Sequence, residues 1–284
     1  MKQLALVLFV EILFNQHVPT VHVEAAVDGF IRTRGVHFLL EGNPYYANGF
    51  NAYWLMYVAS DPSQRPKVSA AFHDATTHGL TVARTWAFSD GGYRPLQYAP
   101  GSYNEQMFKG LDFVIAEARK YRIKHIPSLA NNYDSFGGKK QYVNWARSQG
   151  QYLTSDDDFF TILLVKGYYK NHVTTVLNRY NSFTGIHYKV DETIMAWELM
   201  NEPRLSSTND EYQLLFLNNC LDAHIHDAQS VLRKPILFTE FGKSCKDTGF
   251  NTYKRDQLFN FVYNRMYSSA KRGGPAGGAC FGNY

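Results

Sequence analysis

Residues 194–204 constrain this chain more than any other stretch, and they read Ile-Met-Ala-Trp-Glu-Leu-Met-Asn-Glu-Pro-Arg. The apolar run Ile194–Trp197 is typical of a buried strand. Pro203 has no N–H and fixes its own φ, so we expect the strand to end there, with Glu202 at its tip. A carboxylic acid in that position can act on a molecule that lies across the end of the sheet.

A second apolar run ends in the same way. Residues 235–242 read Pro-Ile-Leu-Phe-Thr-Glu-Phe-Gly and place Glu240 at the end of a short strand. In retaining glycoside hydrolysis one glutamic acid protonates the leaving oxygen and another glutamate attacks the anomeric carbon, with the two carboxyls about 5–5.5 Å apart. Glu202 and Glu240 therefore form a candidate catalytic pair. The alternative is that both are solvated acids at strand ends.

Three further polar side chains belong to the same candidate site. Glu198 lies four residues before Glu202, on the same strand face but deeper, which favours a buried structural role. Arg84 is either the partner of Glu198 or the group that keeps Glu240 ionised. Asn201 is either a turn residue or an amide that hydrogen-bonds a sugar 2-hydroxyl.

Trp86 is a candidate contact for substrate. It ends an apolar run and shares a strand face with Arg84, two residues earlier. Sugar rings present apolar C–H faces, so an indole at a strand end can serve as a stacking platform. The alternative is a core residue at the top of a barrel.

The start of the chain resembles a secretory signal over residues 1–25. Lys2 supplies the charge, Leu4–Phe14 the apolar centre, and Val23–Ala25 the small-residue cleavage site. The alternative is an amphipathic first helix. The apolar run is too short to span a membrane, and the basic residues of this chain, whose net charge is +4, are scattered, so neither a membrane nor a nucleic-acid partner is expected. The predicted mature protein, residues 26–284, is one secreted domain.

Strands alternate with helices along the chain, which predicts the α/β class with a largely parallel sheet of the (β/α)₈ TIM-barrel type. The mature length fits eight strands, but only six are recognisable, so we expect an incomplete barrel. The six predicted strands are Tyr46–Ala52, Leu80–Trp86, Ile123–Leu129, Ile194–Glu198, Ile236–Thr239 and Ala276–Phe281. The predicted helices are Lys67–His78, Glu105–Tyr121, Val143–Gln149, Phe159–Tyr180, Asp210–Arg233 and Arg255–Lys271.

Three motifs, Thr85–Asp90, Trp197–Pro203 and Leu237–Lys243, resemble those of plant endo-β-1,4-mannanases in glycoside hydrolase family 5. The resemblance extends from about Phe30 to Lys271. It implies a TIM barrel that acts on mannan, galactomannan or glucomannan in a plant cell wall, as a monomer without metal or cofactor. The implied roles are acid/base for Glu202, nucleophile for Glu240, and substrate contact or support for Arg84, Trp86 and Asn201.

The chain also departs from the family. Only 35 residues separate Arg204 from Glu240, where the family has several βα units and a His-x-Tyr strand end whose tyrosine supports the nucleophile. Residues 280–282, Cys-Phe-Gly, stand where the family's final strand carries a tryptophan. Cys220 and Cys245 stand where the resemblance leads us to expect tryptophans. We therefore interpret the chain as lacking an internal block after Arg204 and its C-terminal end, which predicts low stability and weak or absent hydrolysis. The alternatives are a non-catalytic carbohydrate-binding relative and another family 5 activity, such as glucan hydrolysis.

Overall fold

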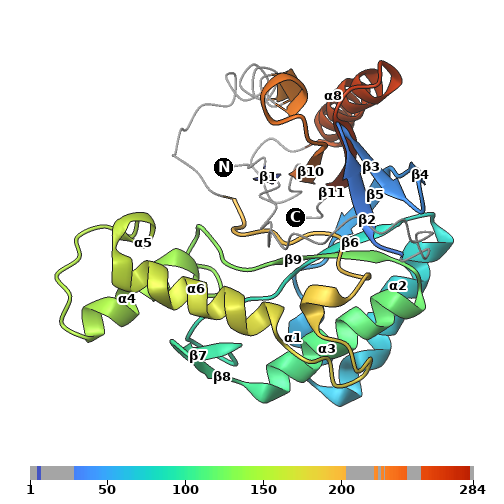
Figure 1. The fold of residues 1–284 in the computed structure, drawn as a ribbon. Coiled ribbons are helices and arrows are strands. Elements are labelled where there is room, and N and C mark those ends of the chain that lie inside the picture. Colours follow the sequence, from blue (N-terminus) through green and yellow to red (C-terminus); the bar gives the residue numbers. More distant parts are fainter. Residues whose placement is uncertain are drawn as a thin grey trace, which may run out of the picture.

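A curled, largely parallel sheet forms the centre of the protein in this computed structural model (Figure 1). The structure describes residues 5–7, 29–202, 221–222, 225–226, 228–241 and 251–281. All neighbouring strands of this sheet are parallel except at β1, which pairs antiparallel with β10. In sheet order the strands are β1 (Ala5–Val7), β10 (Ile236–Phe241), β11 (Ala276–Phe281), β5 (Ala47–Asn51), β6 (Val82–Trp86) and β9 (Lys124–Ser128).

Five of the six predicted barrel strands are present, with ends that shift by at most two residues. The sixth, Ile194–Glu198, is not a continuous strand but runs beside β9 through isolated parallel bridges at Ile194, Glu198 and Asn201. The reason is Pro127 of β9, which cannot donate a backbone hydrogen bond and so interrupts the ladder. Its carbonyl still accepts a bond from the Glu198 N–H at 3.0 Å. The polar end of the segment is thus aligned with the carboxyl end of the sheet.

The described part of the sheet is an incomplete barrel, as the strand count predicted. Six parallel segments are present when residues 194–201 are counted, and β11 joins β10 to β5 across the point where the sheet curls back. The antiparallel strand β1 was not expected, because it lies in the predicted signal.

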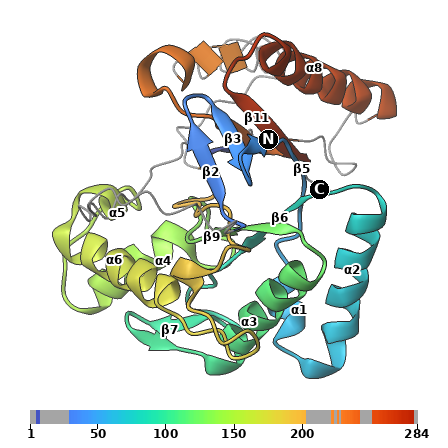
Figure 2. The same ribbon diagram turned by 45° about the vertical axis from the view of Figure 1, so that its right-hand side comes forward.

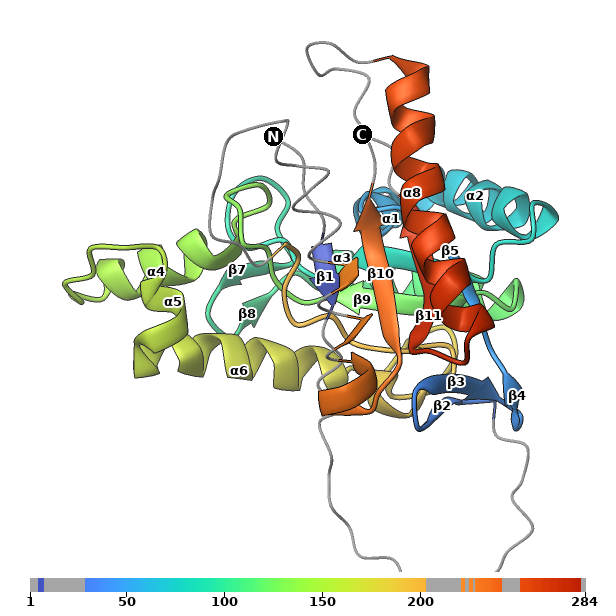
Figure 3. The ribbon, with the colours of Figure 1, turned by 90° about the horizontal axis from the view of Figure 1, so that it is seen from above.

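Helices cover the outer face of the sheet. In Figures 1 and 2 α1 to α3 lie outside β5, β6 and β9, and α4 to α6 extend away as an arm, while Figure 3 shows α8 along β10 and β11. No described helix is long and apolar enough to cross a membrane. The helices are α1 (Leu55–Ala59), α2 (Arg65–Thr77), α3 (Glu105–Lys120), α4 (Gly138–Ser148), α5 (Asp158–Thr161), α6 (Leu163–Leu177) and α8 (Thr252–Lys271), with short turns at Pro62–Gln64, Tyr188–Val190 and Ala228–Leu232.

Two helix predictions need comment. The single helix expected over Phe159–Tyr180 is wrong: it is split into α5 and α6, because Ile162 adopts an extended conformation with ψ 124°. The helix expected over Asp210–Arg233 lies mostly outside the described residues. Its described end includes a π-helical turn at Ala228–Leu232.

The amino end of the barrel is closed by strands β2 (Ile31–Arg34), β3 (His37–Leu40) and β4 (Asn43–Pro44), which form a small antiparallel sheet. Phe38 of β3 is 2% exposed and packs in the barrel interior with residues that include Val82, the first residue of β6. A Cβ at Gly277 would lie 2.3 Å from the Phe38 ring, so only glycine fits there. This apolar layer leaves the carboxyl end of the sheet for polar side chains.

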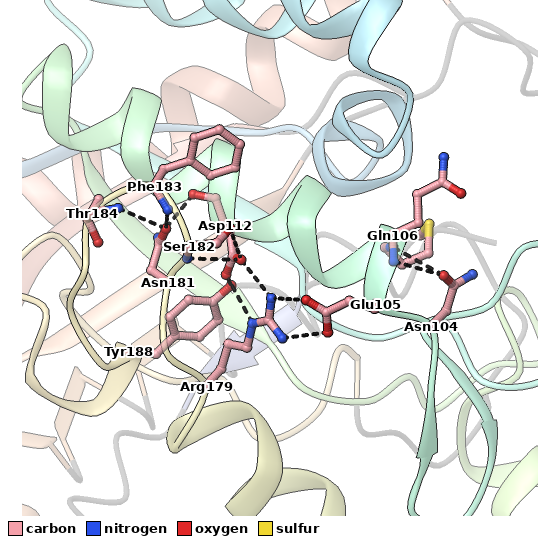
Figure 4. Close-up of polar contacts among 11 residues, drawn as sticks. Asn104, Glu105, Gln106, Asp112, Arg179, Asn181, Ser182, Phe183, Thr184 and Tyr188 are labelled. Carbon is pink, nitrogen blue, oxygen red and sulfur yellow. Dashed lines mark hydrogen bonds and ion pairs between the residues drawn. The ribbon is translucent and has the colours of Figure 1, made fainter.

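Buried Asp112 of α3 fastens the chain just before Ile194 to the helical layer (Figure 4). Its carboxylate accepts bonds from Arg179 at 2.8 and 3.2 Å, from the Ser182 N–H and hydroxyl, and from the Tyr188 hydroxyl at 2.6 Å. Arg179 also binds the exposed carboxylate of Glu105 at 2.6 and 2.7 Å. The segment that leads into residues 194–202 is therefore held by hydrogen bonds to both carboxylate oxygens of Asp112.

Replacing Asp112 by alanine is expected to lower the free energy of unfolding by roughly 3 kcal/mol, because a guanidinium that is 16% exposed would lose its buried partner. The matched control is Glu105→Ala, which removes the 58% exposed partner of the same Arg179 and should cost below about 1 kcal/mol. Urea unfolding of both variants measures the difference. Equal losses would contradict the structural role given to Asp112.

Candidate active site

A buried ion pair occupies the barrel interior towards the carboxyl ends of the strands. Arg84 of β6 donates to Glu198 Oε2 from Nε at 3.0 Å and from Nη2 at 2.6 Å, and both side chains are almost fully buried. Nη2 also donates to Asn201 Oδ1 at 2.5 Å. Of the two partners that the sequence left open for Arg84, the structure contains Glu198, whose expected structural role agrees with this pairing.

Three more polar groups extend this pair to other strands. Arg84 Nη1 donates to Asn51 Oδ1 at 2.9 Å, and Asn51 Nδ2 donates to the Thr239 carbonyl of β10 at 2.8 Å. The Thr239 hydroxyl lies 3.4 Å from Glu198 Oε1. We call Asn51, Arg84, Asn131, Glu198, Asn201 and Thr239 the Arg84 network, since Asn201 Nδ2 also donates to Asn131 Oδ1 at 3.0 Å.

Glu202 directly follows this network. It is 5% exposed and has a φ of +48°, a left-handed backbone that non-glycine residues seldom adopt. Such a conformation persists only where the surrounding structure determines it, and it is found most often at functional sites. The parallel bridge of Asn201 to Asn131 holds the residue before it.

Glu240 lies in β10, one residue before the strand ends, but its side chain lies outside the described residues. The register between β10 and β11 shifts between Phe238 and Phe241, and this stretch includes Glu240. Irregularities of this kind are frequent beside active sites, because they change which side chain faces the site. Thr239, the preceding residue, belongs to the Arg84 network and brings this strand end to the site.

Trp86 ends β6 beyond Arg84 and is half-buried. Its ring contacts Tyr53, Phe88 and Phe136, with centroids 5.0, 4.9 and 4.7 Å away. This packing at the carboxyl end of the sheet agrees with the core role considered for Trp86, and the stacking role stays a prediction.

A second buried polar cluster gathers Asp90, Gln97 and His172 around Tyr142. Burial raises the pKa of Asp90 well above its ordinary value of 3.8, and the Tyr142 hydroxyl and Gly138 N–H offset only part of the rise. Burial also lowers the pKa of His172 to about 4. Both shifts favour the neutral form of the side chain, as expected for ionisable groups that are removed from water.

Sequence patterns identified part of this site. They predicted that Arg84, Asn201 and Glu202 lie together, and the structure brings these three to one place. They missed Asn51 and Asn131, although both are amides at the ends of predicted strands, a signal that could have been used. Within the described residues, no three His, Cys, Asp or Glu side chains gather to hold a metal ion. Cys280 is buried, and the other two cysteines lie outside the described residues.

Solved structures with the same fold are glycoside hydrolases. A family 5 mannosidase from Rhizomucor miehei matches with a TM-score of 0.75 at 21% identity, over 90% of this chain and 86% of that one. An endo-β-1,4-mannanase from Thermotoga petrophila matches with a TM-score of 0.68 at 22% identity, over 84% and 68%. These likenesses place the fold of this chain, with its incomplete parallel barrel, in the TIM-barrel class that these glycoside hydrolases share.

Sequence comparison gives the family. The profile described as "GH family 5 beta-mannosidase-like" matches residues 28–218. The chain is 50% identical to mannan endo-1,4-beta-mannosidase 7 of Arabidopsis thaliana, over 99% of this chain and 84% of that protein, and 49% identical to mannan endo-1,4-beta-mannosidase 1 of Oryza sativa, over 89% and 78%. This protein belongs to the mannanases of glycoside hydrolase family 5.

Replacing Asp90 by asparagine tests its protonation. Since the folded protein keeps the Asp90 proton while the unfolded chain releases it above about pH 4, wild-type stability should fall as pH rises from there towards the folded pKa. The amide in the Asp90→Asn variant has no proton to lose, so thermal unfolding should show the variant gaining stability relative to wild type as the pH rises above about 4. Asp61→Asn is the control: hydrogen bonds from Ser63 lower the pKa of Asp61, so its trend should have the opposite sign. A pH-independent difference for Asp90→Asn would contradict the neutral carboxyl.

Proposed function

We propose that this protein hydrolyses internal β-1,4-mannosidic bonds of mannan, galactomannan and glucomannan by a retaining mechanism. The Arg84 network carries the proposal, because it joins the segment that ends in Glu202 to Thr239, the residue before Glu240. The relatives from Arabidopsis and rice, which are mannan endo-1,4-β-mannosidases by name, support this choice of substrate.

In the proposed mechanism Glu202 gives its proton to the glycosidic oxygen while the Glu240 carboxylate attacks the anomeric carbon, so that the glycosidic C–O bond breaks and a glycosyl ester forms. Water then attacks the same carbon, Glu202 takes its proton, and Glu240 is released. Asn201 Nδ2 carries two hydrogens, and its bond to Asn131 uses one. The other is proposed to bind a sugar 2-hydroxyl.

The proposal includes export and an extracellular, cell-wall location. The charged start, apolar centre and small-residue site of residues 1–25 support it. Trp86 and Arg84 are proposed as substrate-binding and supporting residues, in a monomer that needs no cofactor.

A second candidate is a non-catalytic or weakly active carbohydrate binder. The alignment with the Arabidopsis relative covers 361 positions against 284 residues here, so at least 77 of its positions have no counterpart in this chain. Together with the incomplete sheet of the described residues, this supports the loss of an internal block after Arg204. The tyrosine and tryptophan that the family resemblance places beside the nucleophile and the sugar have no counterparts in the sequence.

Purified protein assayed on galactomannan and on cellulose, by release of reducing ends, separates the candidates. Weak activity on galactomannan with none on cellulose is the expected result, since the chain lacks the family's supporting tyrosine and tryptophan. Activity on cellulose would favour another family 5 specificity, and binding of galactomannan without cleavage would favour the second candidate.

Glu240→Ala is expected to abolish turnover, because no glycosyl ester can form. Glu202→Ala should be slowed by about 10²-fold or more on mannan but far less on an aryl mannoside, whose good leaving group needs little protonation. Steady-state rates of both variants on both substrates measure this. Equal loss on mannan and aryl mannoside for Glu202→Ala would count against its acid role.

A further inference from the structure

Three aromatic rings from three different parts of the chain meet beside the site. Tyr53 follows β5, Trp86 ends β6, and Phe136 lies in the loop between β9 and α4. Trp86 is the central ring, with Tyr53 at 5.0 Å and Phe136 at 4.7 Å, and the outer two are 6.2 Å apart. Tyr53 and Trp86 each stand two residues beyond a member of the Arg84 network, so they lie further towards the carboxyl ends of the same strands.

The open apolar surface of this group belongs to its outer rings. Tyr53 is 50% exposed and Phe136 is 39% exposed, whereas Trp86 is half-buried and stacks on Phe88, which has no exposed surface. Trp86 is therefore supported by a buried ring and in turn supports the two rings that face solvent. An apolar surface held firmly in water beside a polar site is typical of a surface that binds a partner.

The backbone of Phe136 is fixed in a conformation that only its surroundings explain. Its φ is +60°, a left-handed backbone that is strained for a residue with a Cβ. The Asp90 N–H donates to the Phe136 carbonyl at 2.8 Å, and Asn131 Nδ2 donates to the Ser135 carbonyl and hydroxyl at 2.9 Å. Because Asn131 also binds Asn201, the loop that carries Phe136 is tied directly to the Arg84 network.

We propose that Tyr53 and Phe136 form an apolar sugar-binding subsite, supported from beneath by Trp86, for a unit of the polysaccharide remote from the bond that is cleaved. The ligand is a pyranose that presents its C–H face to the two rings, as a β-1,4-linked chain extending from the site would do. This inference rests on the proposed function, and it moves the main stacking contact from Trp86 to its two exposed neighbours.

The test measures binding directly, by calorimetry with mannobiose and mannohexaose, in a Glu202→Gln parent that does not consume the ligand. Tyr53→Leu and Phe136→Leu keep apolar bulk against Trp86 but remove the ring. Each should weaken binding of mannohexaose about five- to tenfold and change binding of mannobiose less than twofold, because stacking on an aromatic ring is worth on the order of 1 kcal/mol. Tyr53→Phe and Phe136→Tyr keep a ring and should bind as the parent does.

Tyr267→Leu is the matched control, since Tyr267 is 66% exposed on α8, outside the barrel. Unchanged mannohexaose binding by both leucine variants, or equal losses for the two ligands, would overturn the subsite alone. A parent that binds no mannohexaose would overturn the proposed function and the subsite with it. Circular dichroism melts verify that each variant is folded.

Discussion

The buried ion pair between Arg84 and Glu198 is the interaction on which the rest of this site depends. A guanidinium and a carboxylate taken out of water are tolerated only when each satisfies the other, so the position of either fixes the position of its partner. Arg84 belongs to β6 and Glu198 to the segment beside β9, and their further bonds reach Asn51 and Thr239 on β5 and β10. One pair of charges thereby aligns the ends of four parallel segments, including the two that carry the candidate glutamates.

The hydrogen bonds to Asp112 hold in place the segment that leads into residues 194–202, just as the Arg84–Glu198 ion pair holds the strand ends inside the site. Residues 194–201 join the sheet only through isolated bridges, since Pro127 interrupts the ladder, so sheet pairing alone would hold them weakly. The bonds from Arg179, Ser182 and Tyr188 to one buried carboxylate fix the preceding chain to α3 instead. In a complete barrel, backbone hydrogen bonds to both neighbouring strands would hold such a segment. Here side-chain hydrogen bonds to the helical layer take over part of that role.

The sequence predicted the elements of this fold well where apolar periodicity decides them. The strand at Ala276–Phe281 is present with the predicted ends, and Glu198, one of the two partners considered for Arg84, is bonded to it. Tyr53 and Phe136 could not be found in this way, because their place depends on loop backbone such as the left-handed φ of Phe136, which no local pattern encodes. The break at Ile162 was missed for a similar reason: an apolar residue in a helical pattern gives no signal of an extended backbone.

The Arg84–Glu198 pair also affects how such a chain can change over evolutionary time. A mutation of either residue alone would leave the other charge buried without its partner, so we expect selection for folding to keep both, whether or not the enzyme still turns over substrate. Asn201, bonded to Arg84, shares part of that restraint. A lineage that lost catalysis would therefore keep these residues long after the glutamates were free to drift. The presence of Arg84, Glu198 and Asn201 therefore shows only that the interior can fold. Catalytic activity has to be judged from side chains that folding does not require, such as Glu202 and Glu240.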